Sequence, residues 1–243
     1  MRIFVDIGAH FGESVFKALN PSLGFDLILA FEPSSYAVKR IQRIKDSRLL
    51  VRHCALGASN KRMTLYGSGS LGASIYDDKK VNTLLPSETI FVKNASEELR
   101  KYVIPENEIF LKLNCEGSEI EILQNLRASG LLKNIDHIYV DWDARKIPSL
   151  QEQYLVFRKK LLDENHDITS ADQFPIQGWV GVERWLGEFK NSKVNFIKKV
   201  QYKTFSFLFL RFRFKELLKY YFPSTIRRVI EVKVLGLKIG AKK

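Results

Sequence analysis

The stretch Val5-Asp6-Ile7-Gly8-Ala9-His10-Phe11-Gly12 decides the fold, because an apolar run passes directly into a glycine-rich turn. Arg2–Asp6 is typical of a short buried strand, and the apolar spacing of Glu13–Leu19 predicts a helix after the turn. Gly8 and Gly12 have no Cβ, so a ligand can approach the backbone closely. The first turn of the helix presents N–H groups at the same place. We therefore expect a strand–turn–helix ligand site here.

Strands and helices continue to alternate beyond this turn. Leu27–Phe31 and Leu49–Cys54 are predicted strands, and Ser34 or Ser35 would cap a helix over 36–44 between them. This alternation favours an α/β fold with a parallel sheet and right-handed crossovers. We further expect strands at Arg62–Tyr66, Ser87–Asn94, Ile109–Asn114 and His137–Val140, helices at Ala95–Val103, Ser118–Ala128 and Leu150–Leu162, and a hairpin within Phe174–Leu186.

The turn has the wrong pattern and charge for a dinucleotide. Its glycines are spaced Gly-x-x-x-Gly rather than Gly-x-Gly-x-x-Gly, and the Asp6 carboxylate would repel phosphates. S-adenosylmethionine fits better, because it carries an ammonium and a sulfonium. Glu32, at the end of the second strand, can accept both hydrogen bonds of a ribose diol. Ala55, after the third strand, would lie beside the adenine. The simpler alternative is that these residues only end strands and turns at a solvated edge.

Two cysteines, Cys54 and Cys115, are too few for a disulfide framework and fit no zinc spacing. We expect both to be buried strand residues and expect no metal site.

The blocks Phe4–Gly12, Ala30–Pro33, Ala55–Gly57 and Leu111–Glu119 together resemble the FkbM family of methyltransferases. The resemblance runs from about residue 2 to residue 142. It implies a Rossmann-like class I methyltransferase fold, with a mostly parallel seven-stranded sheet and helices on both faces. It also implies S-adenosylmethionine as donor and O-methylation of a hydroxyl on a sugar, glycan or similar small acceptor.

The resemblance also implies roles for individual residues. The family's cofactor-binding residues fall on Asp6, Gly8, Gly12 and Glu32. From their positions, Ala55 would join them beside the adenine, and His10 would either approach the cofactor or acceptor hydroxyl or only form the turn. The family's Lys-Ile-Asp-x-Glu-Gly block falls on residues 112–117, where Asn114 replaces the aspartate. An amide is neither a general base nor a strong ligand for a hard metal ion. This substitution motivates an alternative, in which the chain is a catalytically impaired module that binds cofactor or glycan.

The catalytic candidates follow the strands whose carboxyl ends face one crevice. Glu116 is the first choice for a base or for a residue that orients the substrate, with Asn114 and Asp141 beside it. Lys112 is expected either to lie at a strand edge or to pair with an acid. A third alternative uses Asp141 and Asp143 to hold the divalent metal of a glycosyltransferase.

The net charge of +12 lies in the C-terminal part of the chain. Residues 190–243 contain fifteen Lys/Arg and two acidic residues, while residues 1–189 are near neutral. We expect a methyltransferase domain over 1–189 and a basic, aromatic-rich extension over 190–243. The extension would dock on an anionic membrane surface or pack on the domain; nucleic acid ranks third, since no RNA-binding motif is present. We see no secretory signal or membrane-spanning stretch and expect a cytoplasmic protein, peripheral at the inner face of the membrane if the extension docks there.

Overall fold

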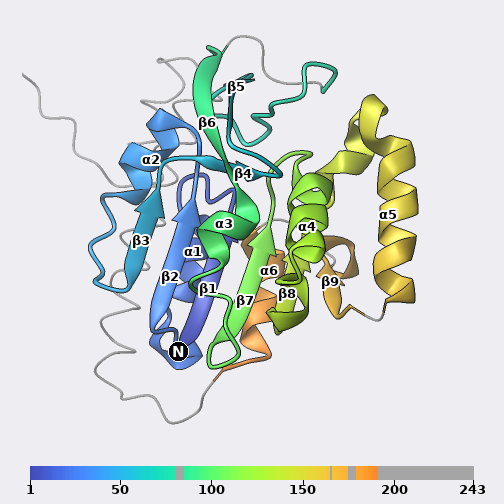
Figure 1. Ribbon diagram of the computed structural model, residues 1–243. Helices are drawn as coiled ribbons and strands as arrows, with labels where there is room; N and C mark the ends of the chain where they lie inside the picture. Colours follow the sequence, from blue (N-terminus) through green and yellow to red (C-terminus); the bar gives the residue numbers. More distant parts are fainter. Residues whose placement is uncertain (80–84, 165, 175–178, 191–243) are drawn as a thin grey trace, which may run out of the picture. The chain divides into compact units, whose positions relative to one another are not determined.

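The computed structural model describes residues 1–79, 85–164, 166–174 and 179–190 (Figure 1). Their main sheet has six strands in the order β3-β2-β1-β7-β8-β9, and every neighbouring pair is parallel. The strands are β1 Arg2–Ile7, β2 Leu27–Phe31, β3 Leu49–Arg52, β7 Glu108–Leu113, β8 His137–Val140 and β9 Ile168–Ser170. The Rossmann-like α/β fold is confirmed, with six strands in the described residues where seven were expected.

Helices cover both faces of this sheet (Figure 1). Helices α1 (Glu13–Ala18) and α6 (Trp179–Gly187) pack together on one face, and α3 (Ala95–Leu99) and α4 (Glu119–Ala128) on the other. Helix α2 (Ser35–Ile41) lies beside β3, and Ser34 caps it by accepting a hydrogen bond from the Ala37 amide at 3.4 Å. Helix α5 (Gln151–Asp163) lies at the β9 end. Short 3-10 segments are η1 Pro21–Leu23, η2 Leu132–Asn134, η3 Asp143–Lys146, η4 Pro148–Leu150 and η5 Ala171–Gln173.

A second sheet stands above the carboxyl ends of the main strands (Figure 1). Its order is β4 (Ala55–Gly57), β6 (Glu88–Asn94) and β5 (Lys61–Leu65), with β6 parallel to β4 and antiparallel to β5. This sheet has a small apolar cluster of its own, formed by Leu65, Ile90 and Val92. It therefore builds a wall over the edge at which the parallel strands end.

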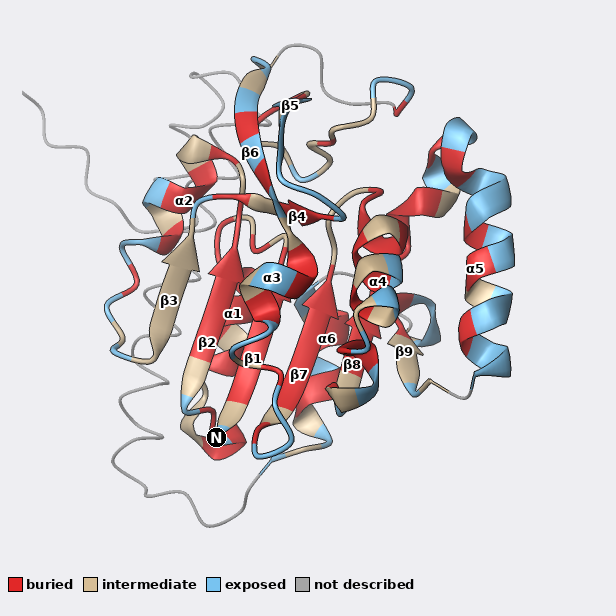
Figure 2. Ribbon diagram, in the orientation of Figure 1, coloured by how far each residue is buried: buried red, intermediate tan, exposed pale blue. Residues whose placement is uncertain are grey.

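The core forms because β1 is buried on both of its faces (Figure 2). Ile3, Val5 and Ile7 belong to the large apolar cluster that also contains residues of α3 and α4. Phe4 points to the opposite face, where its ring lies 5.5 Å from that of Phe25. A strand buried on both faces reads as a continuous apolar run, as the sequence does before the turn.

Two sequence-based predictions about the C-terminal elements need correction. The hairpin expected within Phe174–Leu186 is wrong, because Trp179–Gly187 is the helix α6. Val182, Trp185 and Leu186 are buried at a helical spacing, and the Trp185 ring packs 5.4 Å from that of Tyr139. Strand β9 was not predicted; its three residues, Ile-Thr-Ser, are too few to show an alternating pattern.

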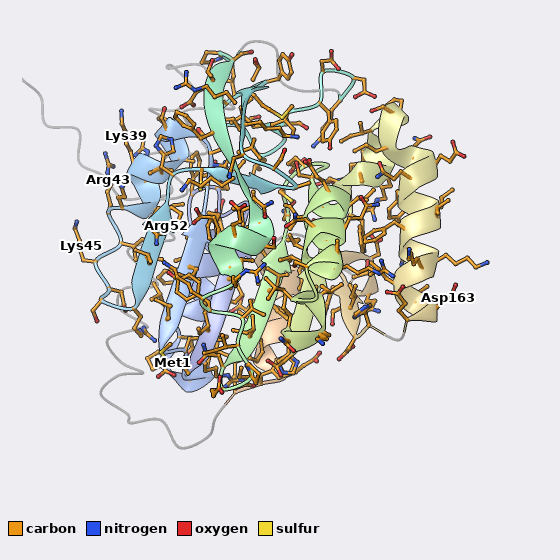
Figure 3. All side chains as sticks on the ribbon, in the orientation of Figure 1. Met1, Lys39, Arg43, Lys45, Arg52 and Asp163 are labelled. Atoms are coloured by element: carbon orange, nitrogen blue, oxygen red, sulfur yellow. The ribbon has the colours of Figure 1, made fainter. Side chains whose placement is uncertain are left out.

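Among the described strands, β3 is an outer strand of the sheet, and cations lie around it. Lys39 on α2 and Arg43 and Lys45 in the following turn are exposed, and Figure 3 shows them projecting from this side of the domain. Arg52 ends β3 itself. The exposed side of the sheet is therefore positively charged.

The expected extension lies outside the described residues, apart from Lys190. Within the described ranges, no helix combines the length and apolar character needed to span a bilayer.

A buried ion pair joins the two central strands. The parallel register places Asp6 of β1 opposite Lys112 of β7. The Lys112 ammonium donates to Asp6 Oδ1 at 2.8 Å and to the Gly8 carbonyl at 2.7 Å. The Asp6 side chain is fully buried and that of Lys112 is 4% exposed. Burial raises the pKa of Asp6, and the Lys112 charge opposes that rise. The expected pairing of Lys112 with an acid is thus confirmed.

Removing one partner of this pair should strongly destabilise the fold. We expect Lys112→Met to lower the free energy of unfolding by about 3–5 kcal/mol, because it leaves a buried carboxylate unpaired. The double variant Asp6→Asn/Lys112→Met should lose less than the sum of the two single variants. Urea unfolding measures the free energy of unfolding of Lys112→Met, Asp6→Asn and the double variant.

Lys93→Met provides the control. Lys93 pairs with Glu98 at 2.8 Å on the surface, where its side chain is 49% exposed, so the loss should stay within about 1 kcal/mol. If the double variant loses as much stability as the two single variants together, Asp6 and Lys112 do not stabilise each other, and the prediction is wrong.

Candidate active site

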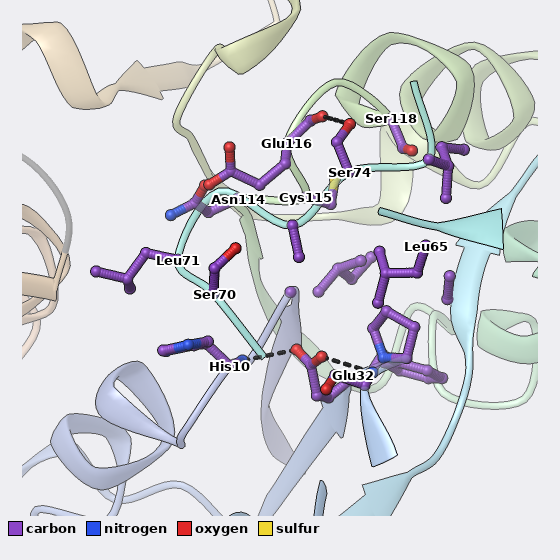
Figure 4. Close-up of a pocket in the computed structure, with 18 of the residues that line it drawn as sticks. His10, Glu32, Leu65, Ser70, Leu71, Ser74, Asn114, Cys115, Glu116 and Ser118 are labelled. Atoms are coloured by element: carbon purple, nitrogen blue, oxygen red, sulfur yellow. Dashed lines mark hydrogen bonds between the residues drawn. The ribbon is translucent and has the colours of Figure 1, made fainter. Parts of the chain in front are cut away.

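A pocket opens at the carboxyl ends of β1, β2 and β7 (Figure 4). Its empty volume, which includes open solvent at the mouth, is about 650 Å³. The lining residues are Ile7, Gly8, His10, Phe31, Glu32, Pro33, Ser34, Ala55, Leu56, Leu65, Gly69, Ser70, Leu71, Ala73, Ser74, Ile75, Asn114, Cys115, Glu116 and Ser118. Six of the predicted site residues meet there: Gly8, His10, Glu32, Ala55, Asn114 and Glu116.

The glycine-rich turn forms the floor of this pocket. The amides of Gly8 and Ala9 donate to the Phe31 carbonyl at 3.0 and 3.1 Å, which ties the turn to the end of β2. Gly8 has φ 81°, and a Cβ added there would lie 1.9 Å from the Asn114 carbonyl oxygen. Only glycine therefore allows β1 and β7 to approach this closely. Gly12, with φ 88°, precedes α1 and does not line the pocket.

Glu32 is held rigidly at one side of the pocket. Its Oε2 accepts the His10 amide at 2.8 Å and its Oε1 accepts the Ser34 amide at 2.8 Å. Burial raises the pKa of Glu32, while the charge of His10 and these two backbone hydrogen bonds oppose the rise. Two backbone donors fix the carboxylate plane, and each oxygen keeps a further lone pair for a ligand.

Beside Glu32 the lining becomes apolar. Phe31, Leu56, Leu65 and Ile75 line this part of the pocket together with Ala55. The predicted strand-end residue Ala55 thus lies in the second sheet, on β4. A flat aromatic group fits such a lining.

The segment between β5 and β6 forms a rim that sequence reasoning did not assign to the site. Its residues Gly69 to Leu71 and Ala73 to Ile75 line the pocket. The Ser68 hydroxyl lies 2.7 Å from Glu88 Oε2 and 2.9 Å from Ser34 Oγ, which anchors the start of the rim. The only signal in the sequence was the Gly-Ser composition of residues 67–70, which indicates a loop but not its position.

The turn after β7 forms the far side of the pocket and is tied to the rim. Asn114 Oδ1 is buried and has no hydrogen-bond partner among the described residues. Glu116 adopts φ 56°, and its carbonyl accepts the Ser74 hydroxyl at 2.7 Å (Figure 4). The Glu116 carboxylate is ion-paired with Lys79, a buried residue at the end of the rim. Lys79 was not predicted, because nothing in its sequence neighbourhood marks it as part of a site.

A fully buried carboxylate, Glu119, supports this turn from below. Its Oε1 accepts the amides of Cys115 and Gly117 at 3.1 Å each, and its Oε2 accepts the Ala144 amide at 3.2 Å. Burial, with the nearby Asp143 charge, raises the pKa of Glu119 to about 7. Glu119 thus connects the turns after β7 and β8.

Besides Gly12, two predicted residues lie outside the pocket lining. Asp6 lies below the turn in its ion pair with Lys112. Asp141 follows β8, where its amide donates to the Leu113 carbonyl at 2.9 Å, and its Oδ1 is buried without a partner among the described residues. Burial and the Asp143 charge raise the pKa of Asp141.

The metal-dependent alternative gains no support from the geometry. Asp143 is ion-paired with Lys146. In the described part of the chain, no three His, Cys, Asp or Glu side chains are grouped so that they could hold a metal ion.

Comparisons with known proteins find a matching family model and a similar solved structure. A family model described as the methyltransferase FkbM domain matches residues 6–168, which is more than half of the chain. Among solved structures, methyltransferase FkbM from Methylobacillus flagellatus KT is similar, with a TM-score of 0.43 and 18% identity. The match covers 65% of this chain but 38% of that one, so the chain spans well under half of its length. No curated protein matches.

Glu119 should make stability depend on pH. Its carboxyl has a higher pKa in the folded chain, about 7, than its ordinary value of 4.5, so the folded state binds more protons between these pH values. The stability it contributes should therefore fall as pH rises from about 4.5 to about 7, by up to about 3 kcal/mol. Urea unfolding between pH 5 and pH 8 should show this fall in the parent and a flatter profile in Glu119→Gln. Glu106→Gln, an exposed carboxylate, is the control; parallel profiles for Glu119→Gln and the parent would contradict the assignment.

Proposed function

Because the chain belongs to the FkbM methyltransferase family, we propose that it transfers a methyl group from S-adenosylmethionine to a hydroxyl of a sugar, glycan or similar small acceptor. The family membership supports methyl transfer as the reaction. The donor and the acceptor are our inferences from the chemistry of the pocket.

The observation that supports S-adenosylmethionine as the methyl donor is the fixed carboxylate of Glu32. Its plane is set by the amides of His10 and Ser34, and it stands at the end of β2 next to an apolar lining. A carboxylate in this position can accept both hydroxyls of a ribose, while the apolar residues bury an adenine. We assign the ribose to Glu32 and the adenine to the region of Ala55.

The remaining cofactor assignments fall on the turn. Gly8 lets the methionine part approach the backbone. Asp6 contributes indirectly: it pairs with Lys112, whose ammonium donates a hydrogen bond to the Gly8 carbonyl. Gly12 shapes the start of α1. Lys112 balances the charge of Asp6, so the negative charge that favours a positively charged ligand over a phosphate here comes from Glu32.

The chain's main contribution to the reaction is alignment. S-adenosylmethionine, when bound, supplies a methyl group on an electrophilic sulfonium. Transfer requires the acceptor oxygen to lie in line with that methyl group, and effective alignment accounts for a large part of such rate enhancements. Asn114 and Glu116 line the far side of the pocket, and we propose that they orient the acceptor, with Asp141 beside them.

A hydroxylated acceptor suits the polar part of the lining. Ser70, Ser118, Asn114 and Glu116 offer both donors and acceptors of hydrogen bonds. A polyol such as a sugar presents the same mixture. The second candidate is a catalytically impaired module that binds cofactor or glycan, and it is favoured by the amide of Asn114 at a position where the family pattern has a carboxylate.

The donor assignment predicts binding that depends on Glu32. We expect the parent to bind S-adenosylmethionine or its demethylated product in the micromolar range. Glu32→Gln should weaken this binding by about 10- to 100-fold, because the variant loses the charge and turns an N–H toward a backbone amide. Calorimetry measures both affinities. Glu152→Gln on the exposed side of α5 should bind as the parent does; no binding by the parent, or equal binding by Glu32→Gln, would refute the assignment.

Variants at Asn114 separate the two candidate functions. We expect the parent to release demethylated cofactor in the presence of an acceptor from a panel of unmethylated sugars, nucleotide sugars and glycans. Asn114→Ala should retain cofactor binding and lose about 100-fold in turnover, because the acceptor is misaligned. If the parent is inactive on every acceptor and Asn114→Asp becomes active, the impaired-module alternative is correct.

A further inference from the structure

Three side chains of the rim contact the turn after β7, and we call them the clasp: Ser74, Tyr76 and Lys79. The Ser74 hydroxyl donates to the Glu116 carbonyl at 2.7 Å. The Tyr76 ring lies so close to Gly117 that a Cβ added there would be 2.8 Å from Tyr76 Cδ2. The Lys79 ammonium is ion-paired with the Glu116 carboxylate. All three members of the clasp thus contact the same two adjacent residues.

Both of these residues have a backbone conformation that most side chains avoid. Glu116 has φ 56° and Gly117 has φ 121°. Glycine adopts such angles readily, whereas glutamate rarely does. A non-glycine residue at positive φ is kept there by the contacts around it, and such positions concentrate at ligand sites. The conformation of Glu116 thus points to a role in ligand binding.

The backbone of this turn has a separate support. Glu119 accepts the amides of Cys115 and Gly117 from below, at 3.1 Å each. The clasp instead acts on Glu116 itself, through its carbonyl and its carboxylate. The Lys79 side chain is 7% exposed and that of Glu116 is 17% exposed. Because little water reaches this ion pair, it fixes the direction of the Glu116 carboxylate more firmly than a surface pair would.

Lys79 has other charged neighbours, but Glu116 is its direct partner. Burial lowers the pKa of Lys79, the charges of Asp143 and Glu119 oppose that change, and Lys146 adds to it. Asp143 is itself ion-paired with Lys146. Within the described ranges, the ion pair that Lys79 forms is therefore the one with Glu116.

One oxygen of the Glu116 carboxylate remains for a ligand. Oε2 is the atom paired with Lys79, and no side chain or amide in the described part of the chain is hydrogen-bonded to Oε1. Glu116 lines the pocket together with the uncharged groups of Asn114, Ser70 and Ser118 (Figure 4). Because Lys79 neutralises Glu116, this side of the pocket offers donors and acceptors of hydrogen bonds without net charge. Such a lining suits an uncharged hydroxylated group better than an ammonium.

We propose that Lys79 is the positioning residue that makes the pocket select uncharged polyols as acceptors. It holds Glu116 so that Oε1 accepts a hydroxyl of the acceptor other than the one that is methylated. It also cancels the charge that would otherwise attract an ammonium. The inference rests on the proposed methyl transfer and adds the property by which acceptors are distinguished. Lys79 acts only through Glu116, because it does not itself line the pocket.

The first test needs neither cofactor nor acceptor. Nitrogen-15 spectra of the lysine ammonium groups, recorded on the full chain, detect those groups that are held in ion pairs away from water. The Lys79 signal is assigned by its absence from Lys79→Arg, and it should be lost in Glu116→Gln. The matched reference is Lys112, whose buried pair with Asp6 does not involve the clasp and whose signal should persist. A Lys79 signal that persists in Glu116→Gln would overturn the inference, because Lys79 would then not hold Glu116.

The second test compares two acceptors in turnover. The first is whichever uncharged acceptor of the panel the parent methylates. The second is an analogue of it in which one hydroxyl that is not methylated is replaced by an amine, each position being taken in turn. The ratio of kcat/KM for the two acceptors measures selectivity for charge separately from general damage to the enzyme. The parent should favour the uncharged acceptor by about 10-fold or more at the position that faces Glu116.

Lys79→Met should reduce this preference by about 10-fold, because Glu116 keeps its charge and attracts the ammonium. We expect kcat/KM for the uncharged acceptor to fall by about 10- to 100-fold, mainly through KM. Lys79→Arg keeps the positive charge and should retain most of the preference. The matched control is Lys61→Met: Lys61 pairs with Glu121 at 3.0 Å, outside the pocket lining, and its loss should change neither acceptor.

Cofactor binding, measured by calorimetry, shows whether each variant is folded. Lys79→Met should bind as the parent does, because Glu32 and Ala55 lie in a different part of the pocket. If Lys79→Met does not bind, Lys79→Gln replaces it with the same expected change in preference, since glutamine removes the charge but keeps a hydrogen-bond donor.

A purely structural role for Lys79 would lower kcat/KM for both acceptors equally and leave the preference unchanged, and that result would refute its role in selectivity. If the parent binds no cofactor or methylates no acceptor of the panel, the proposed function is refuted together with the selectivity that rests on it. The ammonium spectra then still decide whether Lys79 holds Glu116. If the parent turns over and Lys79→Met keeps the parental preference, only the role of Lys79 is refuted.

Discussion

The buried pairing of Asp6 with Lys112 is the constraint on which the rest of the structure depends. It joins β1 and β7 at the centre of the sheet, and the same ammonium holds the Gly8 carbonyl. Such a pair is stable only when both members are present and well hydrogen-bonded. Because the two strands are locked in this register, Gly8 comes to lie directly beside Asn114, where even a methyl group could not fit. The turn after β1 and the turn after β7 are therefore parts of one rigid junction.

Around this junction the pocket is built from parts with different degrees of burial. The floor belongs to strands buried on both faces, and Glu32 and Glu119 tie their ends together through backbone amides. The rim comes from the segment between β5 and β6, whose Leu71 is 50% exposed. Rim and floor meet at Glu116, through Ser74 and Lys79. Glu116, the first catalytic candidate from the sequence, thus lies where the exposed rim of the pocket contacts its buried floor.

The sequence predicted the parts of this site that depend on local pattern. Two features could be recognised from the sequence alone because each follows from local chemistry. One is the buried strand followed by spaced glycines, and the other is the acid at the end of the next strand. Lys79 and the rim residues could not be found this way, because their positions depend on contacts with residues distant along the chain. Helix α6 was mistaken for a hairpin because the aromatic residues and glycines around Trp179 suggested turns, whereas its burial pattern is helical. The extension over 190–243 remains a prediction from charge and composition alone.

The cations beside β3 have a consequence for how the protein behaves in a crowded solution. An outer strand offers unpaired backbone groups to any other strand that approaches, which is a route to misassembly. Here Lys39, Arg43, Lys45 and Arg52 surround that strand, so a second copy would bring the same charges into contact with them. The repulsion acts before any backbone hydrogen bond can form. Repulsion between these charges would oppose pairing of two copies through β3.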